Sequence, residues 1–101
     1  MKTTYKISSI AKKIYPILKR YQIIKASVFG SLARGQDSGN SDIDLLVEFT
    51  GNKSLMDLAG LKIDLEERLK KTVDVLTYKS LHPLLKYKIL SEHKLIYEKR
   101  H

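Results

Sequence analysis

The chain has 101 residues, which is enough for one small domain, residues 1–101, that buries roughly two-thirds of the surface its unfolded form would expose. It contains no cysteine, which excludes disulfides, thiolate metal sites and a thiol nucleophile, and we therefore expect a reducing, cytoplasmic location. The formal net charge of +8 favours phosphate-bearing ligands, nucleic acid or acidic partners, and no stretch approaches the roughly 20 apolar residues of a membrane span.

The first half of the chain predicts one helix and two strands. Residues 2–21 carry apolar side chains at helical spacing, and Pro16 should kink or restart that helix because it lacks a backbone N–H. Ile23–Phe29 is typical of a short buried strand, residues 30–35 of a turn that opens a very short helix, and residues 36–41 of a loop. In residues 42–49, apolar side chains alternate on one face and Leu46 adds apolar character to the other, which indicates a strand covered on both sides.

The second half predicts two helices and two further strands. Ser54 and Asp57 have the spacing of a capping box, and leucines follow at helical spacing up to Leu69. We expect a strand at residues 73–77, a helix from about residue 83 to 92 capped by Ser80, and a last edge strand at residues 95–97. Alternating helices and strands predict an α/β or α+β fold, a small mixed β-sheet flanked by helices.

Two aspartates stand in an otherwise apolar strand, and burying a carboxylate without a partner costs several kcal/mol. Asp42 and Asp44 should share one face, about 7 Å apart, where they repel each other unless a cation such as Mg²⁺ lies between them. Asp74 lies between two valines in a later strand, so that all three acids converge if the strands are neighbours. As alternatives, paired aspartates are often solvated turn or cap residues, and Asp74 can be a charge that protects an edge strand from aggregation.

Gly30 and Ser31 end one strand and open a short helix, where free backbone N–H groups favour an anion. Glycine allows close approach of phosphate oxygens, and the Ser31 hydroxyl can donate one more hydrogen bond. Ser31 can equally act as a helix cap, since a cap and a phosphate use the same N–H groups. The residues together suggest a triphosphate at Gly30 and Ser31, with its metal ions at the three acids.

Gly30-Ser31, ten further residues and then Asp42-Ile43-Asp44 resemble the signature of the DNA polymerase beta type nucleotidyltransferase superfamily. The longer strings FGSLARG and SDIDLLVEF are similar to the minimal nucleotidyltransferase (MNT) group, whose small members are commonly encoded beside HEPN-domain proteins as toxin–antitoxin pairs. VDVLTYKSL and LLKYKILSEHKLIYE also resemble that group, so the resemblance spans most of the chain and implies a polymerase beta-like fold.

The resemblance implies a role for each matching residue. Asp42 and Asp44 would bind two Mg²⁺ ions, and Asp74 would be the third ligand and able to act as general base. Gly30 and Ser31 would hold the triphosphate, whereas Arg34 would contact a phosphate or a partner, or else pair with a nearby acid. The implied activity is transfer of AMP from ATP to a tyrosine of a HEPN toxin, by the antitoxin of a type VII pair in a hetero-oligomer.

Two rival functions remain open. The chain can neutralise the toxin by binding alone, or it can transfer nucleotides to a small molecule or an RNA end. We expect it to work without the additional domains with which larger members choose the base and grip the acceptor, so that either a partner completes the site or specificity is loose. The basic C-terminal part, with Lys79, Lys86 and four further cations, is usually a solvated face in such proteins but can meet RNA or an acidic partner. His82, His93 and His101 lack metal-ligand spacing, and we expect them at the surface.

Overall fold

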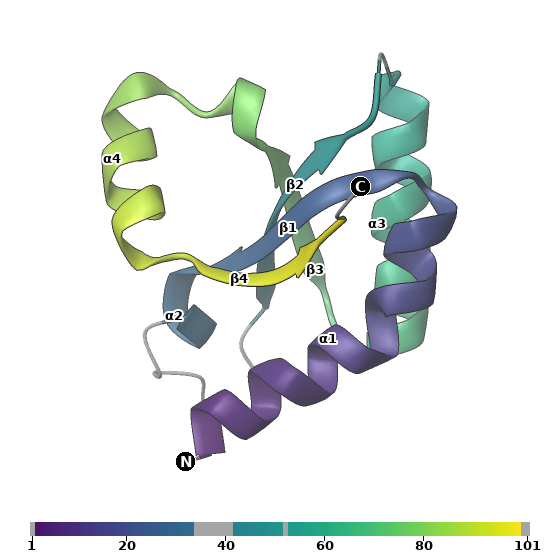
Figure 1. The fold of residues 1–101 in the computed structure, drawn as a ribbon, viewed down its shortest axis with the longest axis horizontal. Helices are drawn as coiled ribbons and strands as arrows, with labels where there is room; N and C mark the ends of the chain where they lie inside the picture. The colour runs from purple at the N-terminus through teal and green to yellow at the C-terminus, as the bar shows by residue number, and fades with distance from the viewer. Residues whose placement is uncertain (1, 34–41, 52, 100–101) are drawn as a thin grey trace.

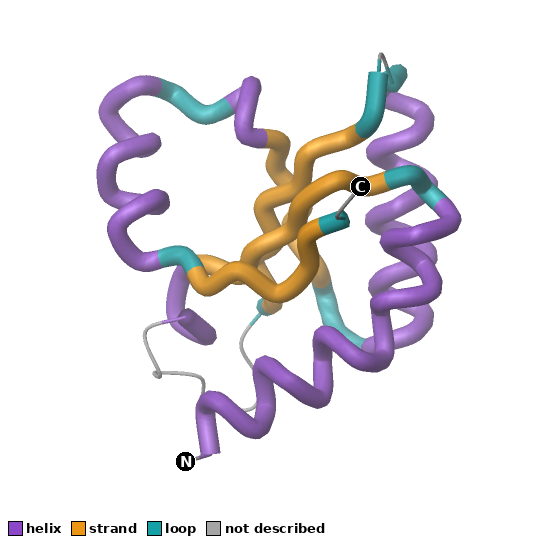
Figure 2. Tube along the Cα trace, viewed as in Figure 1, coloured by secondary structure: helices purple, strands orange, loops and turns teal. Residues whose placement is uncertain are grey.

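The computed structural model describes residues 2–33, 42–51 and 53–99. Helices and strands alternate along the chain (Figure 1), and the strands cross at the centre with helices to either side (Figure 2). In chain order the elements are α1 (Lys2–Arg20), β1 (Ile23–Phe29), α2 (Gly30–Ala33), β2 (Ile43–Phe49), α3 (Leu55–Leu69), β3 (Val73–Thr77), the 3₁₀ turn η1 (Tyr78–Ser80), α4 (Pro83–Glu92) and β4 (Lys94–Glu98).

The four strands form one mixed sheet in the order β3-β2-β1-β4. β1 pairs antiparallel with both β2 and β4, whereas β2 pairs parallel with β3. The parallel pair is connected through α3, as parallel strands require a crossover of a dozen or more residues. The expected mixed sheet with flanking helices is therefore confirmed, and the last strand, β4, lies at an edge as predicted.

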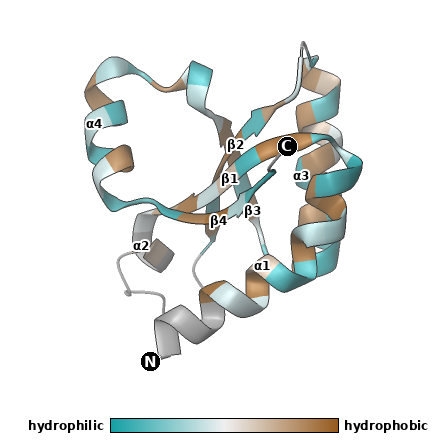
Figure 3. Cartoon of the chain, viewed as in Figure 1, coloured by the Kyte–Doolittle hydropathy of each residue, from teal (hydrophilic) through white to brown (hydrophobic). Residues whose placement is uncertain are grey.

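One face of the sheet is covered by α1 and α3, and this layer contains the hydrophobic core (Figure 1). In β2 the alternating residues Ile43, Leu45 and Val47 belong to that core. They pack with side chains such as Leu18 of α1 and Leu61 of α3, both with no exposed surface. Hydrophobic segments follow the strands and both helices in Figure 3. Asp44, Leu46 and Glu48 alternate with the core positions and therefore point to the other face of the sheet.

Of the two expected outcomes at Pro16, a kink or a restart, the restart does not occur, because α1 continues through this residue; Figure 1 shows the helix changing direction along its length. Its C-terminal end is tied to α3 by Asp64. The Asp64 carboxylate accepts hydrogen bonds from the Tyr21 hydroxyl at 2.6 Å and from the Arg20 guanidinium at 2.8 Å. The hydrogen bond from Tyr21 is the main reason why the pKa of Asp64 lies below its usual value.

Capping explains where the later helices begin. The predicted box at Ser54 is present, since the Ser54 hydroxyl accepts from the Asp57 N–H and the Asp57 carboxylate accepts from the Ser54 N–H. Ser80 does not cap α4, contrary to expectation. It closes η1 by reciprocal hydrogen bonds with Thr77, and His82 caps α4 through Nδ1, which accepts from the Leu84 N–H at 3.2 Å.

Helix α4 lies apart from the core (Figure 1). It has no buried residue, and Leu84, Leu85 and Tyr87 are 81%, 55% and 87% exposed. Hydrophobic side chains on a helix are normally its packing face, so α4 presents such a face to its surroundings. Within the described part of the chain, no helix is long and apolar enough to cross a membrane.

Candidate functional site

The strand register brings two of the predicted acids together. Asp44 in β2 lies directly beside Asp74 in β3, and on its other side it pairs with Phe29, the last residue of β1. Residues opposite each other on neighbouring strands share a face, so both carboxylates belong to the face that α1 and α3 leave uncovered. Asp42 immediately precedes β2 and is exposed. The condition set for convergence of the acids, that their strands be neighbours, is therefore met by β2 and β3.

Gly30 brings the turn after β1 into contact with the Asp44 carboxylate. Its φ of +72° is a conformation that other L-residues rarely adopt. A Cβ atom built on Gly30 would collide with Oδ2 of Asp44 and lie 3.2 Å from its Cγ. Only glycine fits here, and the predicted phosphate turn and the predicted metal ligand are thus direct neighbours in space.

Backbone hydrogen bonds fix the strand starts that carry the acids. The Ile43 N–H donates to the Thr72 carbonyl at 3.0 Å, which joins the two chain segments just before Asp44 and Asp74. The Val73 N–H donates to Oε2 of Glu66 in α3 at 2.9 Å, and the Lys62 ammonium donates to the same oxygen at 3.0 Å. These hydrogen bonds, chiefly the one from Val73, hold the pKa of Glu66 below its usual value.

Glu66 is a positioning residue that the sequence analysis missed. Its side chain anchors the backbone next to Asp74 without lying on the face of the acids. The i,i+4 spacing of Lys62 and Glu66 was visible in the sequence but indicates only a helix-surface ion pair. That Glu66 also binds Val73 depends on how α3 packs against β3.

The three acids do not form a ready-made metal cluster in the described residues, where no three His, Cys, Asp or Glu side chains are grouped closely enough to hold an ion. Asp42 and Asp74 are both exposed. β3 is an edge strand, so the alternative role of Asp74 in protecting an edge also stays open. Arg34 lies outside the described residues, and Ser31 is placed in α2 by its backbone only. The catalytic and binding roles of all these residues stay predictions.

The sequence pattern of the family described as "Polymerase beta, Nucleotidyltransferase" matches residues 12–101, nearly the whole chain. The chain belongs to this family. The resemblance seen in the Gly-Ser and Asp-Ile-Asp motifs is thereby confirmed, as is the expected polymerase beta-like fold.

Individual relatives and solved structures show which nucleotidyltransferases this chain is similar to in sequence and in fold. A Methanocaldococcus jannaschii protein named "Putative protein adenylyltransferase MJ0435" is 57% identical over 86 residues, which cover 85% of this chain and 92% of the relative. A structure described as a "putative minimal nucleotidyltransferase" is 33% identical, with a TM-score of 0.76 over 89% of this chain and 92% of that one. The fold also matches a chain from a complex of a tri-AMPylated Shewanella oneidensis HEPN toxin with an MNT antitoxin. The TM-score is 0.72 and the identity 19%, over 92% of this chain and 73% of that one.

The side chains of this nucleotidyltransferase fit Mg²⁺ in their chemistry. Mg²⁺ is usually held by one or two carboxylates together with water and substrate phosphates rather than by a complete protein cage. The Asp44 and Asp74 pair supplies such carboxylates, and the missing Cβ of Gly30 lets the turn after β1 lie directly against the Asp44 carboxylate. A third acid near the N-terminal end of β2, Asp42, is available to complete the set.

Proposed function

We propose that this protein is a Mg²⁺-dependent nucleotidyltransferase that transfers AMP from ATP to a protein hydroxyl, in particular to a tyrosine of a partner HEPN toxin. The observation that carries the proposal is the register of Asp44 with Asp74 beside the Cβ-free turn at Gly30. Family membership supports the reaction class, and the 57% identical relative named as an adenylyltransferase supports AMP as the transferred group. A type VII toxin–antitoxin role follows by analogy with the complex of a HEPN toxin and an MNT antitoxin, one chain of which shares this fold.

The reaction is an in-line displacement at the α-phosphorus. The acceptor oxygen forms a new bond to that phosphorus, the bond to the oxygen bridging to the β-phosphate breaks, and pyrophosphate leaves with the electron pair. Two Mg²⁺ ions held by Asp42, Asp44 and Asp74 would supply charge neutralisation on the triphosphate and a lower pKa for the attacking hydroxyl. Asp74, on the open edge strand, can accept the hydroxyl proton. The backbone N–H groups of Gly30 and Ser31, at the start of α2, would donate hydrogen bonds to the phosphates.

The surface of α4 supports a protein partner. A helix of ten residues without one buried side chain gains little from its own packing, yet it presents two leucines and a tyrosine. This surface is equally compatible with the rival function, in which the chain neutralises its partner by binding alone.

The test is transfer of label from α-³²P-ATP, with Mg²⁺, to the protein encoded by the neighbouring gene. Replacing a residue that merely supports a metal ligand lowers metal affinity or activity by about 10- to 100-fold. Asp42 would itself be a ligand, so we expect Asp42→Asn to lower the transfer rate by at least about 100-fold. Glu98→Gln serves as a control because it removes an exposed acid from β4, on the opposite edge of the sheet.

The outcomes separate the candidate functions. Label on the partner that is lost with Asp42→Asn and kept with Glu98→Gln supports protein adenylylation. Neutralisation of the partner by Asp42→Asn without any label would establish the binding-only function instead. Label on RNA or a small molecule would keep the reaction class and overturn the proposed acceptor.

A further inference from the structure

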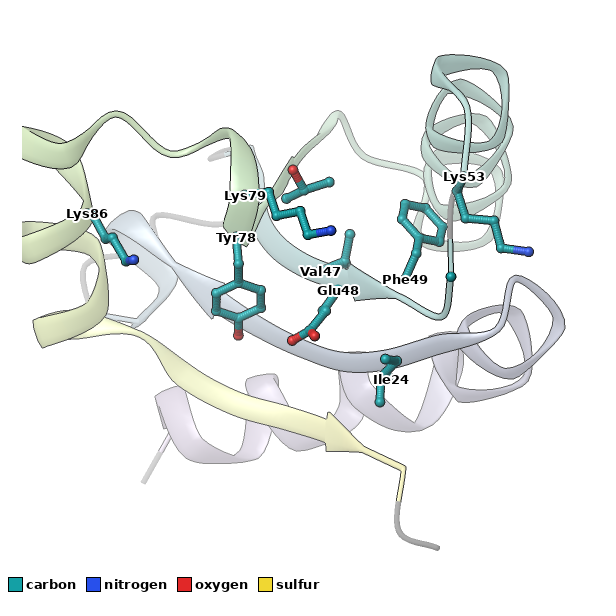
Figure 4. A pocket seen from close by; sticks show the side chains of 10 residues that line it. Ile24, Val47, Glu48, Phe49, Lys53, Tyr78, Lys79 and Lys86 are labelled. Atoms are coloured by element: carbon teal, nitrogen blue, oxygen red, sulfur yellow. The ribbon is translucent and has the colours of Figure 1, made fainter.

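A pocket of about 680 Å³ lies at the end of the sheet away from the acids. It is bordered by the C-terminal end of β2, by Thr77 and η1 after β3, and by α4. Figure 4 shows that its side chains come from all these segments, with Lys86 reaching in from α4 and Lys79 from η1. The lining residues are Ile24, Val47, Glu48, Phe49, Gly51, Lys53, Thr77, Tyr78, Lys79 and Lys86.

The pocket continues the sheet face on which the acids lie. Residues of β2 on this face are Asp44, Leu46 and Glu48, and Glu48 borders the pocket. Glu48 lies four positions after Asp44, which corresponds to about 13 Å along a strand. Between the two ends, the Ser27 and Tyr78 hydroxyls form a hydrogen bond of 2.9 Å. Leu46 and Ser27, which lie between the two ends, have no exposed surface, so the candidate transfer site and the pocket lie on the same face of the sheet on either side of a covered strip.

The pocket carries excess positive charge. Three lysines line it against the single acid Glu48. Lys53 donates a hydrogen bond to the neutral Gln22 side chain at 2.7 Å, and its charge also interacts with the nearby Asp57 carboxylate. Within the described chain, Lys79 and Lys86 form no ion pair, and Lys25 adds a further cation 5.3 Å above the Tyr78 ring. Desolvating such a group of like charges is unfavourable unless an anionic ligand accompanies it.

We propose that this pocket binds an acidic segment of the acceptor protein and so directs the acceptor hydroxyl to the transfer site. The inference rests on the proposed function, because it assigns the acceptor side of the same site. The triphosphate belongs beside Gly30 at the other end of the strands, so the lysines are free for a second anionic molecule. A polypeptide offers carboxylates and apolar side chains together, which suits lysines that stand beside Phe49 and Tyr78. The spacing of about 13 Å places the acidic side chains about four extended residues from the modified hydroxyl.

The experiment measures steady-state adenylylation of the partner by a variant with Lys79→Glu and Lys86→Glu together. We expect KM for the acceptor to rise by about tenfold or more, with kcat at saturating acceptor and the Kd of Mg-ATP little changed. The matched control combines Lys12→Glu with Lys13→Glu, two exposed lysines of α1 that change the net charge equally. A rescue arm replaces with lysine the acidic residues of the acceptor that lie three to five positions from the modified hydroxyl.

Each result decides a separate point. A raised acceptor KM that the charge-exchanged acceptor reverses supports the pocket. An equal rise in the α1 control would show general attraction to the basic protein, and a matching loss of Mg-ATP affinity would assign the pocket to the nucleotide. If the protein binds RNA and the variant with Lys79→Glu and Lys86→Glu does not, RNA is the ligand of the pocket and the proposal is overturned. Calorimetric binding of the partner without ATP tests the pocket even if no transfer occurs, so its failure is distinct from that of the proposed function.

Discussion

Gly30→Ala tests the central feature of the candidate site, the contact between the turn and the Asp44 carboxylate. An alanine at φ +72° costs about 1–2 kcal/mol of folding free energy from backbone strain alone. Its Cβ would also occupy the place of the Asp44 carboxylate, which must move by about 1 Å to reach ordinary contact distance. Since a 1 Å misplacement at an active site can cost about 100-fold in rate, we expect a loss of that order in kcat/KM.

Gly51→Ala is the control because it separates the effect of backbone strain from the effect of a Cβ atom that collides with the Asp44 carboxylate. Gly51 has nearly the same conformation, φ +69°, but a Cβ built there meets nothing within 4 Å. Urea unfolding should give both variants a similar loss of stability, whereas calorimetry should show weakened Mg-ATP binding for Gly30→Ala alone. If Gly30→Ala binds Mg-ATP as tightly as Gly51→Ala and the parent, the turn at Gly30 does not form the nucleotide site with Asp44.

Two further predictions concern the scaffold. Glu66 has a folded-state pKa below its ordinary value of 4.5, so it stabilises the fold above that pH, and this contribution disappears as pH falls through the lower folded pKa. In Glu66→Gln the unfolding free energy should therefore fall less steeply with pH below about 4.5. Glu67→Gln, at an exposed position of the same helix, should follow the parent, and identical slopes for all three proteins would contradict this role of Glu66. Leu61 is fully buried between α3 and the core, so Leu61→Ala should cost about 2–5 kcal/mol in denaturant unfolding. Ile63→Ala, at a position 59% exposed on the same helix, should stay within about 0.5 kcal/mol, and an equal cost for both would show that α3 is not packed as described.

Local patterns predicted most of the elements correctly. The alternation of apolar residues in residues 42–49, the capping box at Ser54 and the short strand predicted at residues 73–77 all correspond to observed elements. The errors concern competition between local alternatives. Ser80 has the side chain of a helix cap, but it bonds to Thr77 in η1, and His82 takes the cap of α4. Pro16 is a different case: of the expected kink or restart only the restart is absent, because packing of the other side chains of α1 on the sheet outweighs one lost hydrogen bond.

The sequence by itself determined the family and the candidate chemistry, since the Gly-Ser turn and the two nearby aspartates are close along the chain and their spacing is directly readable. Only the tertiary structure decided which distant residues join them. The pairing of β2 with β3 sets Asp74 beside Asp44, and the packing of α3 brings Glu66 to Val73. The lysine-lined pocket likewise collects side chains from β2, η1 and α4, which no local pattern relates. Strand register and helix packing are fixed by burial of the whole core, so these positions become visible only when all elements are assembled.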